Sequence, residues 1–377
     1  MQGIYIHVPF CLQKCSYCDF LSFKMDDLVQ EQYVNALLRE MQIYDCELFP
    51  RVIDTVYIGG GTPTALPSLL LCKILDAVRA LNLAGDVEIT VEANPGTLTR
   101  EYLAEMKAHG VTRLSMGLQT TKPHLLKAIN RLHSMEEFVE NFNVARAVGF
   151  DNMNVDLMFA LPGQTESDWR DTLGEIVKLA PEHISAYSLT PAENTPLWDA
   201  LESGEIRLPD EDIDRKMYHM ARQYLADEGY VHYELSNFAK PGFESHHNIN
   251  CWQRVPYIGF GLGASSFDGE KRWRNTEDMQ GYLKTFESQK QSLCPTVWDE
   301  TASRTDIEYL TEGDIHSETM ILGLRMMKGV LERNIPPVFA REVEDLIKNG
   351  LLAHENEFIR LTPRGMDLAN QVFMAFV

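Results

Sequence analysis

The chain has 377 residues, 45% hydrophobic and 24% charged, which is ordinary for a globular protein with one large core and a smaller one. Its 55 acidic and 34 basic residues give a formal net charge of −21, so a nucleic-acid partner is not expected. We also expect a cytoplasmic protein that is not an integral membrane protein, because no signal peptide or membrane-length apolar run is present and seven cysteines, an odd number, indicate a reducing compartment.

Six strands, each followed by a helix, are predicted in the first half of the chain. Capping pairs mark helix starts, as in Asp27 with Gln30 and Ser134 with Glu137, and a glycine cap ends a helix at Gly149. Six such units in a row imply parallel strands with right-handed crossovers, which fits either a doubly wound sheet or a barrel. The predicted strands are 4–8, 55–58, 87–91, 113–119, 152–161 and 183–190.

The second half of the chain is less regular. A long helix ends near residue 228 and leads to a strand near 230–237. The last part is expected to contain helices at 316–328 and 337–348, a hairpin, and a final helix capped by Thr362. This composition suggests a small winged-helix-like α+β module. DNA binding is one role for such a module, but the negative charge favours packing or a lid. The expected boundaries are 1–240, 241–300 and 301–377.

Three cysteines follow the first predicted strand, in the order Cys11-Leu-Gln-Lys-Cys15-Ser-Tyr-Cys18. Thiolates are the ligands of iron–sulfur clusters, and three of them can hold three corners of a four-iron cube while one iron stays open. An open metal position is what a reactive metal site needs. The alternatives are chance clustering or a zinc knuckle, for which His7, in the first predicted strand, is the only nearby fourth ligand.

Glycines and polar residues follow the other predicted strands. The turn Gly59-Gly60-Gly61-Thr62 comes after the second strand, and glycines there let backbone groups approach a ligand closely. Polar side chains stand at or after later strand ends, where a buried charge is costly unless it is paired. They therefore indicate either a bound ligand or an internal Glu–Arg pair. These side chains are Glu92, Gln119, Arg131 and Asp156.

The C-x3-C-x2-C spacing followed by the glycine turn resembles the radical S-adenosylmethionine (SAM) family. The resemblance implies a partial (β/α)6 barrel, with a [4Fe-4S] cluster on Cys11, Cys15 and Cys18 and with SAM on the open iron. In this family an electron from the cluster cleaves the sulfonium of SAM. The resemblance also implies that the turn holds the methionine amino group through Gly60, Gly61 and Thr62.

Further SAM contacts are implied by the same resemblance. Arg131 suits the methionine carboxylate, because a guanidinium pairs with a carboxylate in bidentate fashion. Gln119 and Asp156 suit the ribose hydroxyls, and Glu92 suits the methionine side. Tyr5 lies where coproporphyrinogen-type relatives have a SAM-contacting tyrosine, although a core aromatic in a strand is an equal alternative.

The chain as a whole resembles the branch of oxygen-independent coproporphyrinogen III oxidases and haem chaperones. The oxidases carry an N-terminal extension and a further cysteine two residues after the third, where this chain has Phe20. The motif C-x3-C-x2-C-x-F instead favours the HemW-type haem chaperones. The resemblance is carried by Tyr5-Ile-His7-Val-Pro9-Phe-Cys11, by 59–64, 91–96, 115–119, 156–164 and 233–242, and by the C-terminal module.

The haem chaperones carry an H-N-x-x-Y-W signature, which here reads His247-Asn248-Ile-Asn-Cys251-Trp252. The resemblance implies haem binding at His247, with His246 and Cys251 as alternative ligands and a buried structural histidine as the plainer interpretation. The implied function is delivery of haem to apo-haemoproteins such as respiratory enzymes, with the cluster and SAM supporting haem handling or a homodimer. Whether SAM is cleaved, and so whether the protein is an enzyme, stays open. The alternatives are a coproporphyrinogen oxidase of porphyrin biosynthesis and a radical SAM protein that acts on nucleic acid.

Overall fold

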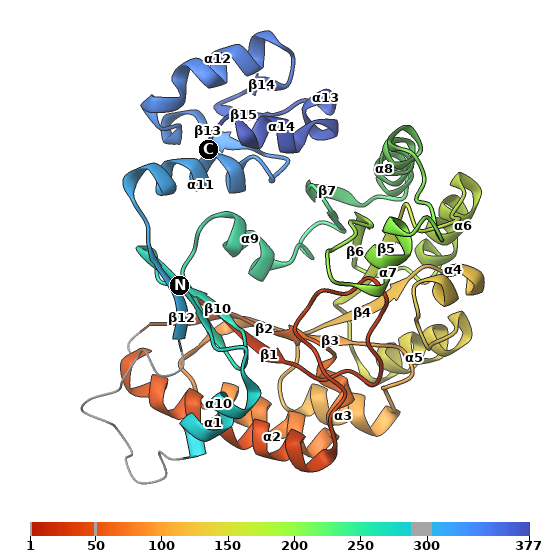
Figure 1. Ribbon diagram of the computed structural model, residues 1–377, viewed down its shortest axis with the longest axis vertical. Coiled ribbons are helices and arrows are strands. Elements are labelled where there is room, and N and C mark those ends of the chain that lie inside the picture. The colour runs from red at the N-terminus through yellow and green to blue at the C-terminus, as the bar shows by residue number, and fades with distance from the viewer. Residues whose placement is uncertain (1, 49–50, 288–303) are drawn as a thin grey trace.

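A twelve-stranded sheet is the centre of the molecule (Figure 1). The computed structural model describes residues 2–48, 51–287 and 304–377, with the backbone alone for 44–48. The strand order is β12-β11-β10-β9-β1-β2-β3-β4-β5-β6-β8-β7. The first six strands are Gln2–Val8 (β1), Ile53–Gly60 (β2), Leu83–Ala93 (β3), Arg113–Gln119 (β4), Met153–Phe159 (β5) and His183–Ser188 (β6).

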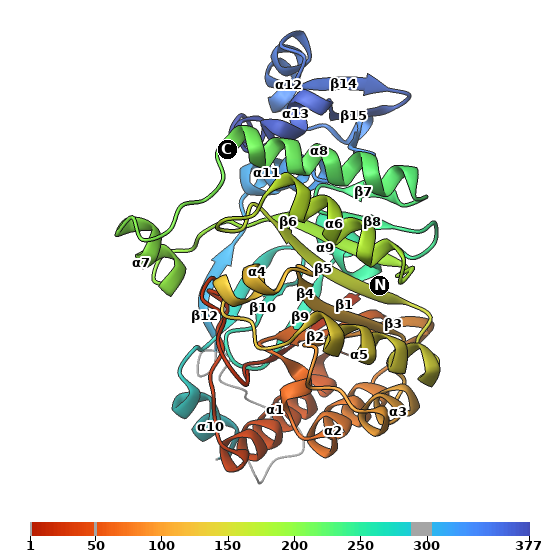
Figure 2. The same cartoon turned by 90° about the vertical axis from the view of Figure 1, so that its right-hand side faces the viewer.

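Strands β1 to β6 pair in parallel and in the order of the chain. Because this order has no reversal, right-handed crossovers place the connecting helices on one face, as in a barrel and unlike a doubly wound sheet. Figure 2 shows the first three of these helices and the fifth packed side by side along the outer face. They are Asp27–Leu48 (α1), Ser68–Arg79 (α2), Arg100–Ala108 (α3), Pro123–Ala128 (α4), Met135–Val148 (α5) and Glu166–Val177 (α6). The predicted α/β fold with six βα units is confirmed.

Further strands extend both ends of the sheet. Beyond β6 lie Val231–Glu234 (β7) and Asn237–Ala239 (β8), which pair antiparallel. On the other side Tyr257–Phe260 (β9) pairs parallel with β1, followed by Ser265–Phe267 (β10), Lys271–Asn275 (β11) and Arg304–Tyr309 (β12). The expected connecting region therefore contributes strands to the sheet. The remaining helices of this part are Pro196–Glu202 (α7), Glu211–Asp227 (α8), His246–Trp252 (α9) and Met279–Glu287 (α10).

Side chains alternate between the two faces of the parallel strands, as a period of two requires. In β3, Ile89 and Val91 are buried toward the helices, whereas Glu88, Thr90 and Glu92 share the opposite, inner face. The outer face therefore builds the apolar core and the inner face collects polar groups. The inner-face residues of the other strands include Tyr5, His7, Thr55, Tyr57, Arg113, Ser115, Asn154, Asp156, His183 and Tyr187.

Most predicted helix ends are found where expected. The Ser134–Glu137 capping box and the left-handed cap at Gly149 enclose α5. The predicted capping pair of Asp27 with Gln30 is wrong by one residue. The helix α1 begins at Asp27, so the residue that caps it is Asp26, whose carboxylate accepts a hydrogen bond from Val29 N at 3.0 Å.

The C-terminal module has helices Glu312–Gly323 (α11), Ala340–Lys348 (α12), Pro363–Asp367 (α13) and Ala369–Met374 (α14). Its three-stranded sheet joins Val330–Leu331 (β13), Phe358–Leu361 (β15) and Leu352–Glu355 (β14). The predicted hairpin and the Thr362 cap, which accepts from Gly365 N, are confirmed. The first helix begins four residues earlier than predicted, because Thr311 and Asp314 form an unpredicted capping box. Backbone bonds link the module to the barrel, from Met327 N to Tyr233 O and from Leu235 N to Arg325 O.

Candidate metal and cofactor site

The carboxyl ends of the parallel strands surround one cavity of about 290 Å³. A second cavity of about 220 Å³ adjoins it and shares Gln13, Cys15, Thr62, Asn94 and Arg131. Together they are of the size that small-molecule sites occupy. Strand ends are also where barrel enzymes carry their chemistry. Of the predicted site residues, the first cavity brings together Cys11, Cys15, Cys18, Gly60, Gly61, Thr62, Glu92, Gln119, Arg131 and Asp156.

The three cysteines sit on the loop that follows β1. Their loop is pinned at its middle to the turn after α4, where Gln13 Nε2 donates to Asn130 Oδ1 at 2.8 Å and Asn130 Nδ2 donates to Lys14 O at 3.1 Å. Burial raises the pKa of the Cys11 thiol and raises that of Cys18 to about 11. Metal loading must therefore expel protons from these thiols.

Within the described residues, no three His, Cys, Asp or Glu side chains converge on a point where they could hold one metal ion. The three thiols instead line the wall of a cavity. A cluster with several irons needs thiols spaced around it, whereas a zinc knuckle needs its ligands around one ion. Three thiols are a donor set that an iron–sulfur cluster takes from a protein, whereas His7, the fourth ligand of the zinc alternative, bonds through its ring to Tyr5 Oη and Leu21 O.

The glycine turn leaves no room for side chains. A Cβ on Gly61 would lie 2.7 Å from the Phe10 carbonyl oxygen, and one on Gly60, whose φ is +108°, would lie 2.5 Å from the His7 ring. A Cβ on Gly59 would meet the Glu92 carboxylate at 2.7 Å. Only glycines fit at these three positions, and their backbone can therefore line the cavity directly.

Glu92 is held by the turn beside it. Its carboxylate accepts from Tyr57 Oη at 2.7 Å and from Gly60 N at 3.2 Å. Burial, with the charge of Asp156 adding to it, raises the pKa of Glu92 from 4.5 to about 7. A cation entering the cavity would favour the ionised form.

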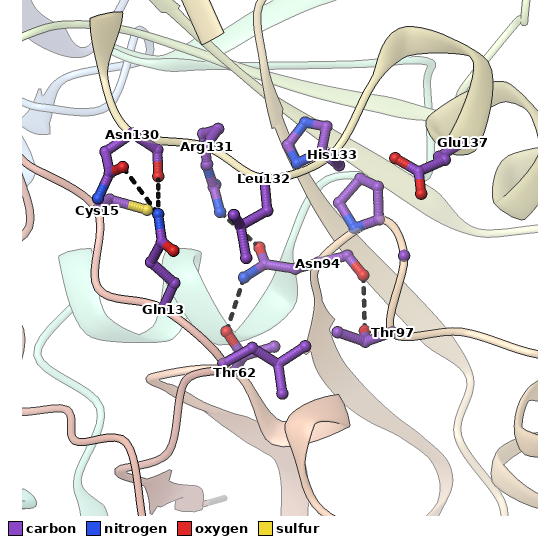
Figure 3. Close-up of a pocket in the computed structure, with 13 residues that line it drawn as sticks. Gln13, Cys15, Thr62, Asn94, Thr97, Asn130, Arg131, Leu132, His133 and Glu137 are labelled. Atoms are coloured by element: carbon purple, nitrogen blue, oxygen red, sulfur yellow. Dashed lines mark hydrogen bonds between the residues drawn. The ribbon is translucent and has the colours of Figure 1, made fainter. Parts of the chain in front are cut away.

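A bridge of side chains crosses the junction of the two cavities (Figure 3). Asn94 Nδ2 donates to Thr62 Oγ1 at 2.7 Å, and Asn94 Oδ1 accepts from Arg131 Nη1 at 2.8 Å. Arg131 Nε has no hydrogen-bond partner in the described residues, so the guanidinium has capacity for an acceptor. Sequence reasoning did not select Asn94, although it lies two residues after Glu92 in the same turn.

Gln119 and Asp156 line the floor of the cavity. Gln119 has a left-handed φ of +74°, and its Oε1 accepts from Tyr187 Oη at 3.0 Å. Asp156 accepts from Asn154 Nδ2 at 2.7 Å, and burial raises its pKa. Tyr187, also missed from the sequence, is the last residue but one of β6, so its place near the carboxyl end of a strand was the available signal.

Two predicted site residues lie outside this cavity. Tyr5 Oη bonds to His7 Nδ1 at 2.9 Å, and His7 Nε2 bonds to Leu21 O at 2.8 Å, so this pair ties β1 to the end of the cysteine loop. His247 lies on α9 with 7% of its surface exposed, and its Nδ1 bonds to Thr55 Oγ1 at 3.0 Å. The centroids of the His247 and Tyr57 rings are 5.2 Å apart, and burial lowers the pKa of His247 to about 4.

Family models match both parts of the chain. The Radical SAM superfamily model matches residues 5–176, and the model of the HemN C-terminal domain matches residues 310–368. The first region contains the cysteine loop and all the cavity residues named above except Tyr187. The second falls within the C-terminal module. In the described residues no helix is long and apolar enough to cross a bilayer.

Similar proteins cover the whole chain. The protein named heme chaperone HemW of Bacillus subtilis is 35% identical, across 100% of this chain and 99% of its own length. The HemW of Lactococcus lactis is also 35% identical, across 99% and 96%. Among solved structures, coproporphyrinogen III oxidase (HemN) of Escherichia coli matches with a TM-score of 0.82 and 23% identity, covering 100% of this chain and 90% of that one. At that identity the likeness shows a shared fold.

Proposed function

This chain belongs to the HemW family of radical SAM proteins, and from that premise we propose that it binds haem and delivers it to apo-haemoproteins. Radical SAM membership implies a [4Fe-4S] cluster and SAM. The observation that carries the proposal is the full-length likeness to relatives named heme chaperone HemW.

We assign the cluster to Cys11, Cys15 and Cys18. Their thiols line one cavity, and this donor set matches what an iron–sulfur cluster takes from a protein. When bound, the cluster supplies one-electron chemistry to SAM. The chain itself holds the cysteine loop in place, because Gln13 and Lys14 are hydrogen-bonded to Asn130 in the turn after α4.

We assign SAM to the rest of the cavity. The Gly60–Gly61–Thr62 turn and Glu92 would hold the methionine ammonium, since carbonyls and a carboxylate are acceptors for it. Arg131, which keeps an unpaired Nε, would take the carboxylate. Gln119 and Asp156 would accept from the ribose hydroxyls. Tyr5 would position the cysteine loop through His7 instead of touching SAM.

The oxidase alternative is less well supported. Phe20, at the position of the extra cysteine of the oxidases, lies at the cavity wall with 64% of its surface exposed and cannot ligate metal. The similarity to the solved oxidase shows a shared fold and does not by itself support a shared reaction. We therefore propose haem handling without coproporphyrinogen oxidation. The cytoplasm, respiratory enzymes as recipients, and a homodimer remain part of the same proposal.

The test compares two activities of one anaerobic preparation reconstituted with iron, sulfide and SAM. Haem is titrated by difference absorbance, and the haem-loaded protein is then mixed with an apo-haemoprotein such as an apo-cytochrome. In parallel, coproporphyrinogen III is supplied with a reductant. We expect haem binding and transfer, and no protoporphyrinogen. Turnover of coproporphyrinogen, or failure to bind haem, would refute the proposal.

A further inference from the structure

A row of hydrogen-bonded side chains runs from the cofactor cavity toward the amino ends of the barrel strands. It begins at Asp156, whose carboxylate lines the cavity and accepts from Asn154 Nδ2 at 2.7 Å. Asn154 Oδ1 lies 2.6 Å from His183 Nδ1, and His183 Nε2 lies 2.8 Å from Tyr233 Oη. The last link is the backbone N–H of Ser245, the residue that caps α9, which donates to Tyr233 Oη at 3.3 Å. Residues from β5, β6, β7 and the start of α9 thus form one row.

The links beyond Asp156 are closed to solvent. Asn154, His183 and Ser245 are each at most 2% exposed, and Tyr233 is also buried. Buried polar groups normally keep their hydrogen bonds, because water cannot replace a lost partner there. The row is therefore expected to hold a single arrangement.

The direction of each hydrogen bond follows from the two ends of the row. An ionised Asp156 carboxylate can only accept, so the Asn154 amide nitrogen faces it and the amide oxygen faces His183. That oxygen needs a donor, which places the His183 proton on Nδ1 and leaves Nε2 to accept from Tyr233 Oη. Burial lowers the pKa of His183 well below its usual value, which keeps the ring in this neutral form.

Every donor in the row therefore points toward Asp156. The His183 ring has both nitrogens engaged, so it cannot turn without breaking two buried hydrogen bonds. It fixes the Asn154 amide, which Ser185 Oγ also contacts at 3.2 Å and which itself donates to Ser115 Oγ at 2.8 Å. Hydrogen bonds arranged head to tail polarise one another, which strengthens the bond that the terminal carboxylate accepts.

We propose that His183 is a positioning residue for SAM, which acts through Asn154 to hold the Asp156 carboxylate in the orientation that accepts from the ribose hydroxyls. Tyr233 and the backbone N–H of Ser245 hold the far side of the ring. His183 does not itself line the cavity. The inference rests on the proposed assignment of SAM to this cavity and adds a residue that the assignment does not include.

Two substitutions separate the two ring nitrogens. His183→Asn puts an amide nitrogen near the place of Nδ1, so the donor to Asn154 stays and the acceptor for Tyr233 is lost. His183→Gln puts an amide oxygen near the place of Nε2, so the acceptor stays and the donor is lost. The matched control is His232→Gln, since His232 precedes Tyr233 in β7, points to the opposite face and bonds to Leu235 O at 3.3 Å.

The experiment measures binding to the full chain with its cluster reconstituted, by calorimetry, for SAM and for a SAM analogue that lacks both ribose hydroxyls. Only SAM carries the groups that Asp156 would hold, so only SAM reports the orientation of this carboxylate. We expect His183→Gln to weaken SAM binding about tenfold and binding of the analogue less than about twofold. His183→Asn and His232→Gln should stay within about twofold of wild type for both ligands.

The failures are distinguishable. A wild-type chain that binds no SAM, or that binds SAM and the analogue equally, would refute the assignment of SAM to this cavity. If wild type prefers SAM but His183→Gln weakens both ligands equally, or neither, the positioning role is refuted and the assignment stands. A loss of SAM affinity in His183→Asn as large as that in His183→Gln would also overturn the positioning role.

Should both His183 variants fail to fold, the nitrogen-15 spectrum of histidine-labelled wild type decides. The His183 signal is identified by its shift in Tyr233→Phe, which removes only the hydroxyl on Nε2. We expect a proton on Nδ1 and a signal that moves more with SAM than with the analogue, because the ribose hydroxyls would draw on the Asp156 charge. A proton on Nε2, or equal movement with both ligands, would overturn the inference.

Discussion

Neutralising Glu92 tests the electrostatics of the cavity. The change is Glu92→Gln, which keeps the size of the side chain and an oxygen for Tyr57 Oη. Burial raises the pKa of Glu92 from 4.5 to about 7, so folding favours its protonated form. The resulting stability is fully present below pH 4.5 and is lost as the pH rises through about 7.

The magnitude follows from the two pKa values. A rise from 4.5 to about 7 corresponds to roughly 3 kcal/mol, at about 1.4 kcal/mol for each pH unit. This is an upper limit, because the carboxylate faces the cavity and solvent screens part of its charge. In the SAM-free protein, we therefore expect Glu92→Gln to unfold at higher denaturant than wild type at pH 8. At pH 4 the two should be close. SAM binding should be lost, since the amide offers no charge to the ammonium.

Glu40 provides the matched control. Its pKa is also raised to about 7 by burial, and it accepts from Tyr282 Oη at 2.6 Å at a place away from the cavity. Glu40→Gln should show the same pH dependence of stability and keep SAM binding. The assays are urea unfolding at several pH values and calorimetric SAM titration. The reasoning is refuted if the stability difference between Glu92→Gln and wild type does not change from pH 4 to pH 8.

Three further results are expected. Gly60→Ala should destabilise the protein by roughly 1–3 kcal/mol more than Gly163→Ala in thermal unfolding. Both glycines have a positive φ, but only a Cβ on residue 60 would collide with the His7 ring. Equal losses of stability in the two variants would contradict this. Asn94→Ala should weaken SAM binding by about tenfold in calorimetry, since it breaks the bridge between Thr62 and Arg131; unchanged affinity would show that the bridge does not position SAM. Cluster reconstitution should release protons to the buffer, because burial raises the pKa of the Cys18 thiol to about 11; a pH-stat trace with no uptake of base would argue against ligation by protonated thiols.

The sequence was most informative where one residue determines local geometry. The Ser134–Glu137 capping box, the Gly149 cap and the Thr362 cap all follow from the chemistry of helix ends and are found as predicted. The site residues at strand ends could also be predicted from the sequence, because parallel strands end at one edge of the sheet. Glu92 and Asp156 therefore meet in one cavity although they are far apart in the chain.

Other features depend on tertiary contacts that no local pattern reveals. Asn94 bridges Thr62 and Arg131 only after three turns have come together. The direction of the His247 ring is set by Glu88 and Thr55, which lie on two different strands. The strands β9 to β11 are only four, three and five residues long, which is too short for a period of two to stand out, so the sheet extension could not be predicted from periodicity.

Iron uptake tests the central claim most directly. The chain, reconstituted anaerobically with iron and sulfide, should hold about four irons and give the spin signal of a reduced cubane that changes when SAM is added. The triple variant with alanine at Cys11, Cys15 and Cys18 should hold almost no iron, whereas Cys72→Ala should match wild type. Equal iron content and an unchanged signal in the triple variant would contradict the account.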